Sequence, residues 1–344
     1  KDGTTRYDMT ELAITHFKPK EVETSIAKLK LIGYTHDTYG KELINDEQII
    51  ELRCQDLILP ACPESPDEGA DKVLTNVANF IDDLLENLYE LPRYYNIKTR
   101  EDLVGHLLIG LSPHTAAGIV CRIVGFSKTQ GMFAHPYLHS IMRRDTDGDE
   151  AGVMLVLDAF LNFSREMLSN HRGATQDEPL VLTSLLVPKE VDDMVFDMDI
   201  VWEYPLEFYE ACMEYKPAYE FKMLTIKQVL STDKQYEGFG FTHNTTDINM
   251  GVICSQYKLI PTMEDKVFGQ MKIAEILGCV DENDVARLII ERHFMKDIKG
   301  NLRKFSMQQF RCVDCNEKFR RPPLKGICSK CNGKILFTIS EGSV

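Results

Sequence analysis

The clearest hydrophobic pattern in the chain runs through residues 73–88, where apolar side chains recur at intervals of three and four. This spacing places them on one face of an α-helix and predicts an amphipathic helix that packs on a core. The residues on the face are Val73, Leu74, Val77, Phe80, Ile81, Leu84, Leu85 and Leu88. A Pro- and acid-rich stretch at residues 60–70 comes before them and is typical of a linker.

Beyond residue 103 the pattern changes. Short apolar runs at residues 107–111 and 119–126 are separated by turn residues, which predicts a mixed, β-rich unit. A strongly apolar stretch at residues 153–168 predicts a helix that is buried on most sides. Residues 180–201 have the composition of strands with interspersed acids, and residues 205–295 have a mostly helical pattern.

These patterns predict an α+β chain of five parts. They are a mixed N-terminal segment of the core, a linker with its helix, a β-rich region, a mainly helical region and a small C-terminal module. Their bounds are residues 1–60, 61–102, 103–204, 205–300 and 301–344.

At 344 residues, of which 44% are hydrophobic, the chain is long enough for two or three domains with a real core. It contains no run of eighteen apolar residues, so we expect no membrane span. No signal-peptide pattern is visible, and the first residue is Lys1. We therefore expect this sequence to continue upstream in a longer protein.

Cysteine usage favours a reducing compartment, and we expect a cytoplasmic location. Of the ten cysteines, six are scattered singly and four form two tight pairs, Cys312-x-x-Cys315 and Cys328-x-x-Cys331. Two such pairs, twelve residues apart, present four thiolates to one tetrahedral Zn²⁺ ion. Four protein ligands leave no open position, so the pattern predicts a structural zinc ribbon.

The formal net charge of −14 argues against nucleic acid at first, but the charge is unevenly distributed. Residues 296–334 hold eleven Lys or Arg and three acids, a local +8 that leaves −22 on the rest. Such asymmetry favours a basic surface that meets a polyanion. The alternative is that the surroundings of a zinc site are simply basic.

An acidic loop reads Asp145-Thr-Asp147-Gly148-Asp149. Three carboxylates this close repel one another unless a cation is present. Mg²⁺ takes carboxylate and water oxygens, and Gly148 lets the backbone bend towards such an ion. The loop is not an EF-hand, because Glu150 stands at position 6 and Val156 at position 12. A solvated acidic turn is the remaining alternative to a divalent metal site.

The text around this loop, from His135-Pro-Tyr-Leu-His139 to Glu150, resembles the catalytic segment of the large subunit of archaeal family D DNA polymerase. Further segments that resemble sequences of this family are spread over nearly the whole chain. They include residues 14–20, 33–37, 80–85, 105–106, 113–115, 202–210, 236–243 and 320–325.

The resemblance implies a fold built on double-psi β-barrels, the catalytic architecture shared with multi-subunit RNA polymerases. It also implies that a second barrel, upstream of this sequence, completes the site. In the family the loop reads D-x-D-G-D, so Asp147 and Asp149 carry over as catalytic metal ligands. Asp145 is a weaker assignment, since Asn is frequent at its position in the family.

The implied reaction is attack of a primer 3′-hydroxyl on the α-phosphate of a dNTP, with Mg²⁺ or Mn²⁺ at the loop. Basic side chains near the loop are candidates to contact phosphates: Lys128, His135, His139, Arg143 and Arg144. The alternatives are a hydrogen-bonding role in the core for each histidine and ion pairing with the loop for each arginine.

We therefore expect a DNA-directed DNA polymerase segment. Its implied partners are primer–template DNA, dNTP, the small exonuclease subunit of a multifunctional enzyme and a sliding clamp. A metal-dependent nuclease remains open, because two-metal carboxylate sites also serve hydrolysis. A zinc-ribbon scaffold that binds DNA without catalysis is the alternative outside enzymes.

Overall fold

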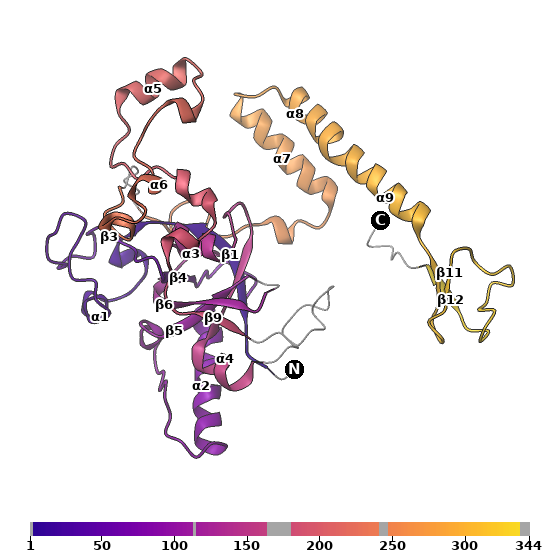
Figure 1. The fold of residues 1–344 in the computed structure, drawn as a ribbon, viewed down its shortest axis with the longest axis horizontal. Coiled ribbons are helices and arrows are strands. Elements are labelled where there is room, and N and C mark those ends of the chain that lie inside the picture. Colours follow the sequence, from indigo (N-terminus) through magenta and orange to yellow (C-terminus); the bar gives the residue numbers. More distant parts are fainter. Residues whose placement is uncertain (1–2, 113–114, 164–179, 241–246, 338–344) are drawn as a thin grey trace. The chain divides into compact units, whose positions relative to one another are not determined.

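The computed structural model describes residues 3–112, 115–163, 180–240 and 247–337 (Figure 1). The chain divides into two compact units, Lys1–Ser255 and Gln256–Val344. Each has its own architecture. Across the described ranges, no helix combines the length and the hydropathy that crossing a membrane requires.

The first unit is built on a closed barrel of six strands. The strands follow one another around it in the order β4-β7-β1-β8-β5-β6, and β6 pairs again with β4. They are β1 (Tyr7–Ala13), β4 (Asp56–Pro60), β5 (Leu107–Leu111), β6 (Ala117–Ser127), β7 (Met132–Ala134) and β8 (Glu150–Leu155). The pairs β1–β7 and β4–β6 are parallel and the others antiparallel. The α+β class is thus confirmed.

Strand β4 closes the barrel, because its two edges pair with different partners. Leu57 lies opposite Ala134 of β7, whereas Ile58 lies opposite Gly125 of β6 after a shift in register. All five residues of β4 are buried. The barrel therefore combines two strands from residues 1–60 with four strands from the β-rich region.

The prediction of one buried helix over residues 153–168 is wrong at its start. Residues up to Leu155 belong to strand β8, and a short helix α4 (Val156–Asn162) follows. Residues 164–168 lie outside the described residues. Strand β8 runs between β1 and β5, and five of its six residues are buried. A strand covered on both faces lacks the alternation that distinguishes it from a buried helix.

The strands expected over residues 180–201 are also corrected beyond β9 (Val181–Thr183), which pairs with β6. The rest forms two short 3₁₀ turns, η4 (Pro188–Glu190) and η5 (Asp193–Asp197). The Asp192 side chain accepts the Met194 N–H and starts the second turn. Such local acceptors compete with a sheet ladder, which explains the difference.

The amphipathic helix predicted from the 73–88 pattern is α2 (Ala70–Asn87), which lies against the barrel and beside α4 (Figure 1). Its inner face carries Leu74, Val77, Ile81 and Leu85, all buried in the main core. Phe80 belongs to the predicted face but is 57% exposed. The buried stripe is therefore narrower than the apolar pattern.

Short elements complete the first unit. They are β2 (His16–Phe17), η1 (Pro19–Glu21), α1 (Ile26–Leu31), β3 (Ile50–Glu51), η2 (Arg100–Leu103), α3 (Pro136–Ile141), α5 (Leu206–Met213), η6 (Ala218–Glu220), α6 (Ile226–Val229) and η7 (Asp233–Gln235). Several residues between 186 and 239 enter the main core from these turns, so they extend the barrel core.

The second unit has helices followed by a small three-stranded sheet. After η8 (Tyr257–Leu259) come α7 (Met263–Leu277) and a continuous helical segment of α8 (Glu282–Ile289), the π-helix η9 (Ile290–Phe294) and α9 (Met295–Met307). The sheet has the order β11-β10-β12 and pairs antiparallel throughout. Its strands are β10 (Phe310–Cys312), β11 (Lys318–Phe319) and β12 (Ile335–Phe337).

Candidate metal centres

The acidic loop connects helix α3 to barrel strand β8. His135 caps α3, because its Nδ1 accepts the Tyr137 N–H at 3.1 Å, and Pro136 occupies the first helical position. The loop then turns through two left-handed positions, Thr146 with φ 62° and Gly148 with φ 119°. The first end of the loop is bound to helix α3 through the Arg144 N–H and the His139 carbonyl, and the other end to β1 through the Asp149 carbonyl and the Glu11 N–H.

Three carboxylates converge on this loop. One oxygen from each of Asp145, Asp147 and Asp149 lies within 4.8 Å of the other two. The pKa of Asp147 is raised, first by its hydrogen bond with Asp145 and then by the negative charges of Asp145 and Asp149. A raised pKa is the sign of charge that lacks a counter-ion, so the donor set fits a hard divalent cation.

The two arginines before the loop have different partners. Arg144 Nη1 lies 3.3 Å from Asp149 Oδ2, which is the ion pair with the loop weighed as an alternative. Arg143 Nη1 instead donates to Asp192 Oδ2 at 2.9 Å and holds the pKa of Asp192 below its usual value. The Arg143 side chain is 67% exposed and that of Arg144 is 23% exposed. Arg143 is therefore the more accessible cation.

Both histidines lie in the core, each only 1% exposed. Burial lowers the pKa of His135 to about 3, so its ring is neutral. His139 Nε2 donates to the Leu12 carbonyl at 3.0 Å, and its Nδ1 lies 2.8 Å from Glu11 Oε1. These contacts favour the hydrogen-bonding role weighed as the alternative to phosphate contact.

Lys128 is an exposed residue at the end of β6. Its Nζ lies 3.4 Å from Glu23 Oε1, and its backbone N–H donates to Asn249 Oδ1 at 2.7 Å. Neither partner belongs to the acidic loop. Phosphate contact by Lys128 thus stays a prediction.

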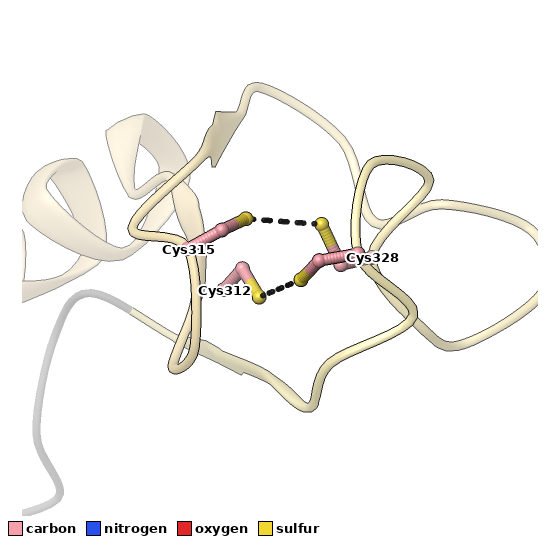
Figure 2. A group of neighbouring side chains, drawn as sticks. Cys312, Cys315 and Cys328 are labelled. Atoms are coloured by element: carbon pink, nitrogen blue, oxygen red, sulfur yellow. Dashed lines mark hydrogen bonds between the residues drawn. The ribbon is translucent and has the colours of Figure 1, made fainter.

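The four paired cysteines form a second cluster, in which the four sulfur atoms lie within 4.8 Å of one another (Figure 2). The Sγ atoms of Cys312 and Cys331 are 3.4 Å apart, and those of Cys315 and Cys328 are 3.5 Å apart. Four thiols that converge in this way from two C-x-x-C pairs match the ligand set of a structural Zn²⁺ site. The coming together of the four cysteines is thus as the sequence predicts.

Each C-x-x-C pair is followed by an asparagine in the left-handed conformation. Asn316 has φ 61° and donates its N–H to the Cys312 carbonyl at 3.1 Å. Asn332 also has φ 61° and donates to the Cys328 carbonyl at 2.9 Å. Asparagine tolerates this conformation better than most residues, so the repeated C-x-x-C-N text is itself a signal for two matching turns.

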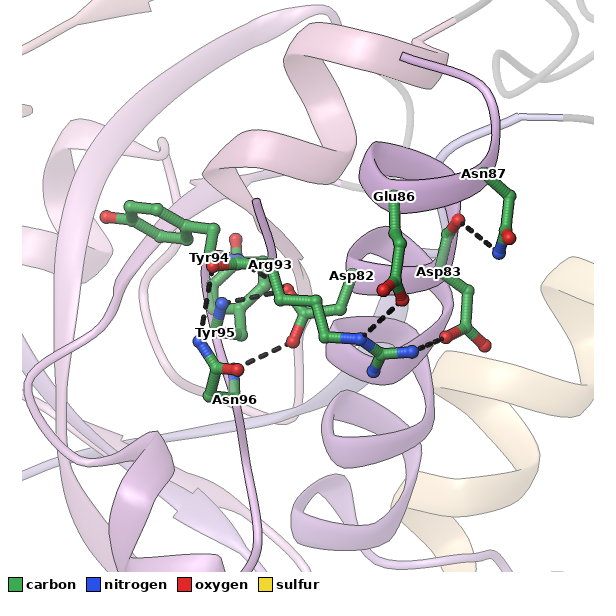
Figure 3. A network of polar contacts seen from close by, with 8 residues as sticks. All are labelled: Asp82, Asp83, Glu86, Asn87, Arg93, Tyr94, Tyr95 and Asn96. Atoms are coloured by element: carbon green, nitrogen blue, oxygen red, sulfur yellow. Dashed lines mark hydrogen bonds and ion pairs between the residues drawn. The ribbon is translucent and has the colours of Figure 1, made fainter. Parts of the chain in front are cut away.

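Sequence reasoning missed two buried acids that organise the first unit. Glu11, on strand β1, is the partner of His139 and lies 128 positions before it. Asp82, on helix α2, accepts the N–H groups of Tyr94, Tyr95 and Asn96 at 2.7–2.9 Å (Figure 3). An acid inside a predicted apolar face is the only sequence signal for Asp82, and Glu11 offers none without its distant partner.

Comparison with known proteins fits this geometry. The family model described as DNA polymerase II large subunit DP2, catalytic domain, matches residues 1–266, which include the acidic loop. The DNA polymerase II large subunit of Methanococcus vannielii is 49% identical over all of this chain and 30% of its own length. Those of Pyrococcus furiosus and Archaeoglobus fulgidus are both 50% identical, over 27% and 30% of their lengths.

The chain thus spans less than a third of the relatives it matches, while the matches run over its full length. The archaeal sources of these relatives agree with the resemblance seen in the motifs. The matched span includes both the acidic loop and the cysteine pairs. This chain therefore belongs to the family of the catalytic domain of the DNA polymerase II large subunit.

Proposed function

We propose that this chain supplies the catalytic carboxylates of a DNA-directed DNA polymerase. The observation that carries the proposal is the convergence of Asp145, Asp147 and Asp149 within 4.8 Å, on a barrel-edge loop, in a chain of this polymerase family. Asp147 and Asp149 are the firmer ligands, and Asp145 adds a third carboxylate.

The loop would hold Mg²⁺ or Mn²⁺. When bound, such ions activate the 3′-hydroxyl of a primer and offset the charge on the phosphates of a dNTP. The chain itself contributes position and charge. Arg144 sets the Asp149 carboxylate by its ion pair, and exposed Arg143 is available to a phosphate if it leaves Asp192. Lys128 is a further candidate for the DNA backbone.

We further propose that the six-stranded barrel is a double-psi barrel of the RNA-polymerase type. A closed barrel with both parallel and antiparallel pairs supports this assignment. The five-part division of the chain, with a catalytic region at residues 103–204 and a zinc ribbon at 301–344, belongs to the same proposal.

The cysteine cluster would hold one structural Zn²⁺, and the surplus of basic residues at 296–334 would lie near DNA. Contacts of this kind with phosphates would be independent of sequence. The proposed partners are primer–template DNA, dNTP, a small exonuclease subunit and a sliding clamp, in the cytoplasm.

The test is primer extension by the full-length large subunit with its small subunit, with and without Mg²⁺. Metal-dependent dNTP incorporation that is lost in Asp147→Asn supports the proposal. Metal-dependent release of nucleotides, without incorporation but equally sensitive to Asp147→Asn, would assign this loop to a nuclease. DNA binding with neither activity would favour the scaffold.

A further inference from the structure

Four contacts form a closed ring that links the two ends of the acidic loop to strand β1 and helix α3. The Glu11 N–H donates to the Asp149 carbonyl at 3.1 Å, and the Glu11 carboxyl lies 2.8 Å from His139 Nδ1. The His139 carbonyl in turn accepts the Arg144 N–H at 3.1 Å. Arg144 Nη1 completes the ring at Asp149 Oδ2, 3.3 Å away. The ring therefore joins the residues on either side of Asp145 and Asp147.

The side-chain link of this ring is fully buried. Glu11 is 0% exposed, and its second oxygen, Oε2, has no hydrogen-bond partner within the described residues. A buried carboxyl without a partner is strongly unfavourable. Because the hydrogen bond to His139 is the polar contact that the Glu11 carboxyl makes here, that bond is unfavourable to break.

The ring also fixes the orientation of the imidazole. A carbonyl oxygen only accepts, so His139 Nε2 must carry the proton that it donates to Leu12. Leu12 is the strand neighbour of Glu11, and both ring nitrogens are therefore held by β1. Helix α3, which carries His139, is thereby fastened to the same strand that binds the end of the loop.

We propose that the Glu11–His139 pair is a positioning pair, which holds the acidic loop so that its carboxylates converge before a cation binds. The inference rests on the proposed function, since it concerns the metal affinity of the same loop. Neither residue belongs to the group of three converging carboxylates. Both act through the backbone positions of Arg144 and Asp149.

The distinguishing variants differ only at the buried side chain. Glu11→Ala removes the contact to His139 but keeps the backbone N–H that binds Asp149. Glu11→Asp keeps a carboxyl group but shortens the side chain by one methylene, out of reach of Nδ1. Glu11→Gln keeps the length, and its amide both donates and accepts, so it rebuilds the hydrogen bond with either form of the imidazole.

The measurement is Mn²⁺ binding by the full chain with its zinc retained, followed through the electron paramagnetic resonance signal of free Mn²⁺. We expect Glu11→Ala and Glu11→Asp to raise the Kd about tenfold or more, in the range seen when residues that orient metal ligands are replaced. Glu11→Gln should bind within about threefold of the parent chain, because the hydrogen bond that orients the loop is kept.

The matched control is Asp82→Asn. It also weakens a buried acid that organises backbone, but its contacts go to residues 94–96. If it lowers the melting temperature as much as Glu11→Ala and leaves the Kd unchanged, loss of stability alone does not weaken the site. An equal rise in Kd for Asp82→Asn, or a parental Kd for both Glu11→Ala and Glu11→Asp, overturns the proposal.

Failure of the underlying function looks different. If Asp147→Asn binds Mn²⁺ as the parent chain does, the loop is not the metal site, and the proposed function fails with it. If Asp147→Asn loses the ion while the Glu11 variants keep it, only the positioning role fails. Weak binding by Glu11→Gln together with Glu11→Ala would also count against a role for the hydrogen bond.

Discussion

The two candidate metal centres differ most in what surrounds their ligands. The acidic loop is anchored to a barrel and a large core, and its ring of contacts runs into fully buried residues. The cysteine cluster belongs to a unit in which the described buried hydrophobic residues are Ala274, Cys312 and Cys328. Two of these three are cluster cysteines themselves.

The difference teaches which site depends on its ion for structure. The barrel can fold around an empty loop, because the loop adds only repulsion to a core that is already complete. The small sheet has almost no core of its own, so its ligands must supply the stability. The acidic loop is thus carried by a fold that does not need an ion, whereas the small sheet should need its ion in order to fold.

Removal of zinc should have the largest effect. Structural zinc in small modules contributes about 10–16 kcal/mol of binding free energy, which is folding free energy here. We expect a strong chelator, or Cys312→Ser, to unfold residues from about 305 onward. Metal analysis should give about one zinc per parent chain, and hydrogen exchange should show lost protection in β10 and β12.

The barrel provides the control for that experiment. Strands β1 and β8 should keep their protection after chelation, and Mn²⁺ should still bind at the loop. Protein purified without chelators and found to hold no zinc would contradict the ribbon assignment. So would a chelated chain whose β10 remains protected.

Replacement of Asp147 or Asp149 by Asn should give the next largest effect, on rate and not on folding. Loss of a main electrostatic element costs about 10²–10³ in rate, and loss of a metal costs more. We expect nucleotide incorporation by the full-length enzyme to fall at least that far, measured by primer extension. Asp145→Asn should be milder, because Asp145 is the weakest of the three proposed ligands and an amide oxygen can still face a cation.

Thermal melts of all three variants serve as the control, and no variant should melt lower than the parent chain. DNA binding should persist, since it depends on Arg and Lys elsewhere. Parental incorporation by Asp147→Asn and Asp149→Asn would remove the assignment, and so would a loss of activity that follows unfolding.

The stability of the first unit should fall in acid because of His135, the residue that caps helix α3 before the loop. Burial lowers the pKa of His135 to about 3, below its ordinary value of 6.5. The stability due to the neutral ring is thus present above pH 6.5 and is lost as the pH falls towards about 3. One such group contributes a loss of about 2 kcal/mol between pH 7 and pH 5. Urea unfolding at a series of pH values measures it.

His135→Asn keeps a good helix cap but no longer titrates, so it should flatten this pH dependence. The same substitution at exposed His36 is the matched control and should leave the parental slope. A slope that is unchanged in His135→Asn would show that another group accounts for the acid sensitivity.

The smallest expected effect concerns the metal-free loop. The pKa of Asp147 is raised by Asp145 and Asp149, so its ionised form destabilises the folded state. The contribution of protonated Asp147 to stability is therefore present below its pKa in the unfolded chain and is lost as the pH rises through its pKa in the folded chain. Asp147→Asn should therefore melt slightly higher than the parent at pH 7 without metal. The difference should vanish at acid pH and reverse with saturating Mg²⁺.

Local signals in the sequence predict that the side chains of each candidate metal centre come together. Two C-x-x-C pairs and three alternate acids lie within short stretches, so backbone geometry alone brings their side chains together. The sequence does not distinguish the roles of Arg143 and Arg144, because it does not show that Asp192 pairs with the first and Asp149 with the second.

Non-local pairing could not be predicted in the same way. The sequence of strand β8 resembles that of a buried helix because residues on both faces of the strand are buried, while β1 and β5 pair with its two edges. The role of Glu11 cannot be predicted locally, because only the fold of β1 against α3 brings its carboxyl beside His139. The closure of the barrel by β4 depends on a register with residues 122–127, which no local pattern encodes.

The pairing of β1 with β8 also has a consequence for how the chain is made. Tyr7 lies opposite Val153, so β1 leaves the ribosome well before its partner exists. At about 5–20 residues per second, roughly 7–30 s of translation separate the two strands. During that time β1 has an unpaired edge, the kind of edge that templates aggregation. A stalled chain that ends before residue 150 would hold five of the six barrel strands and would leave open the edge of β1 that pairs with β8.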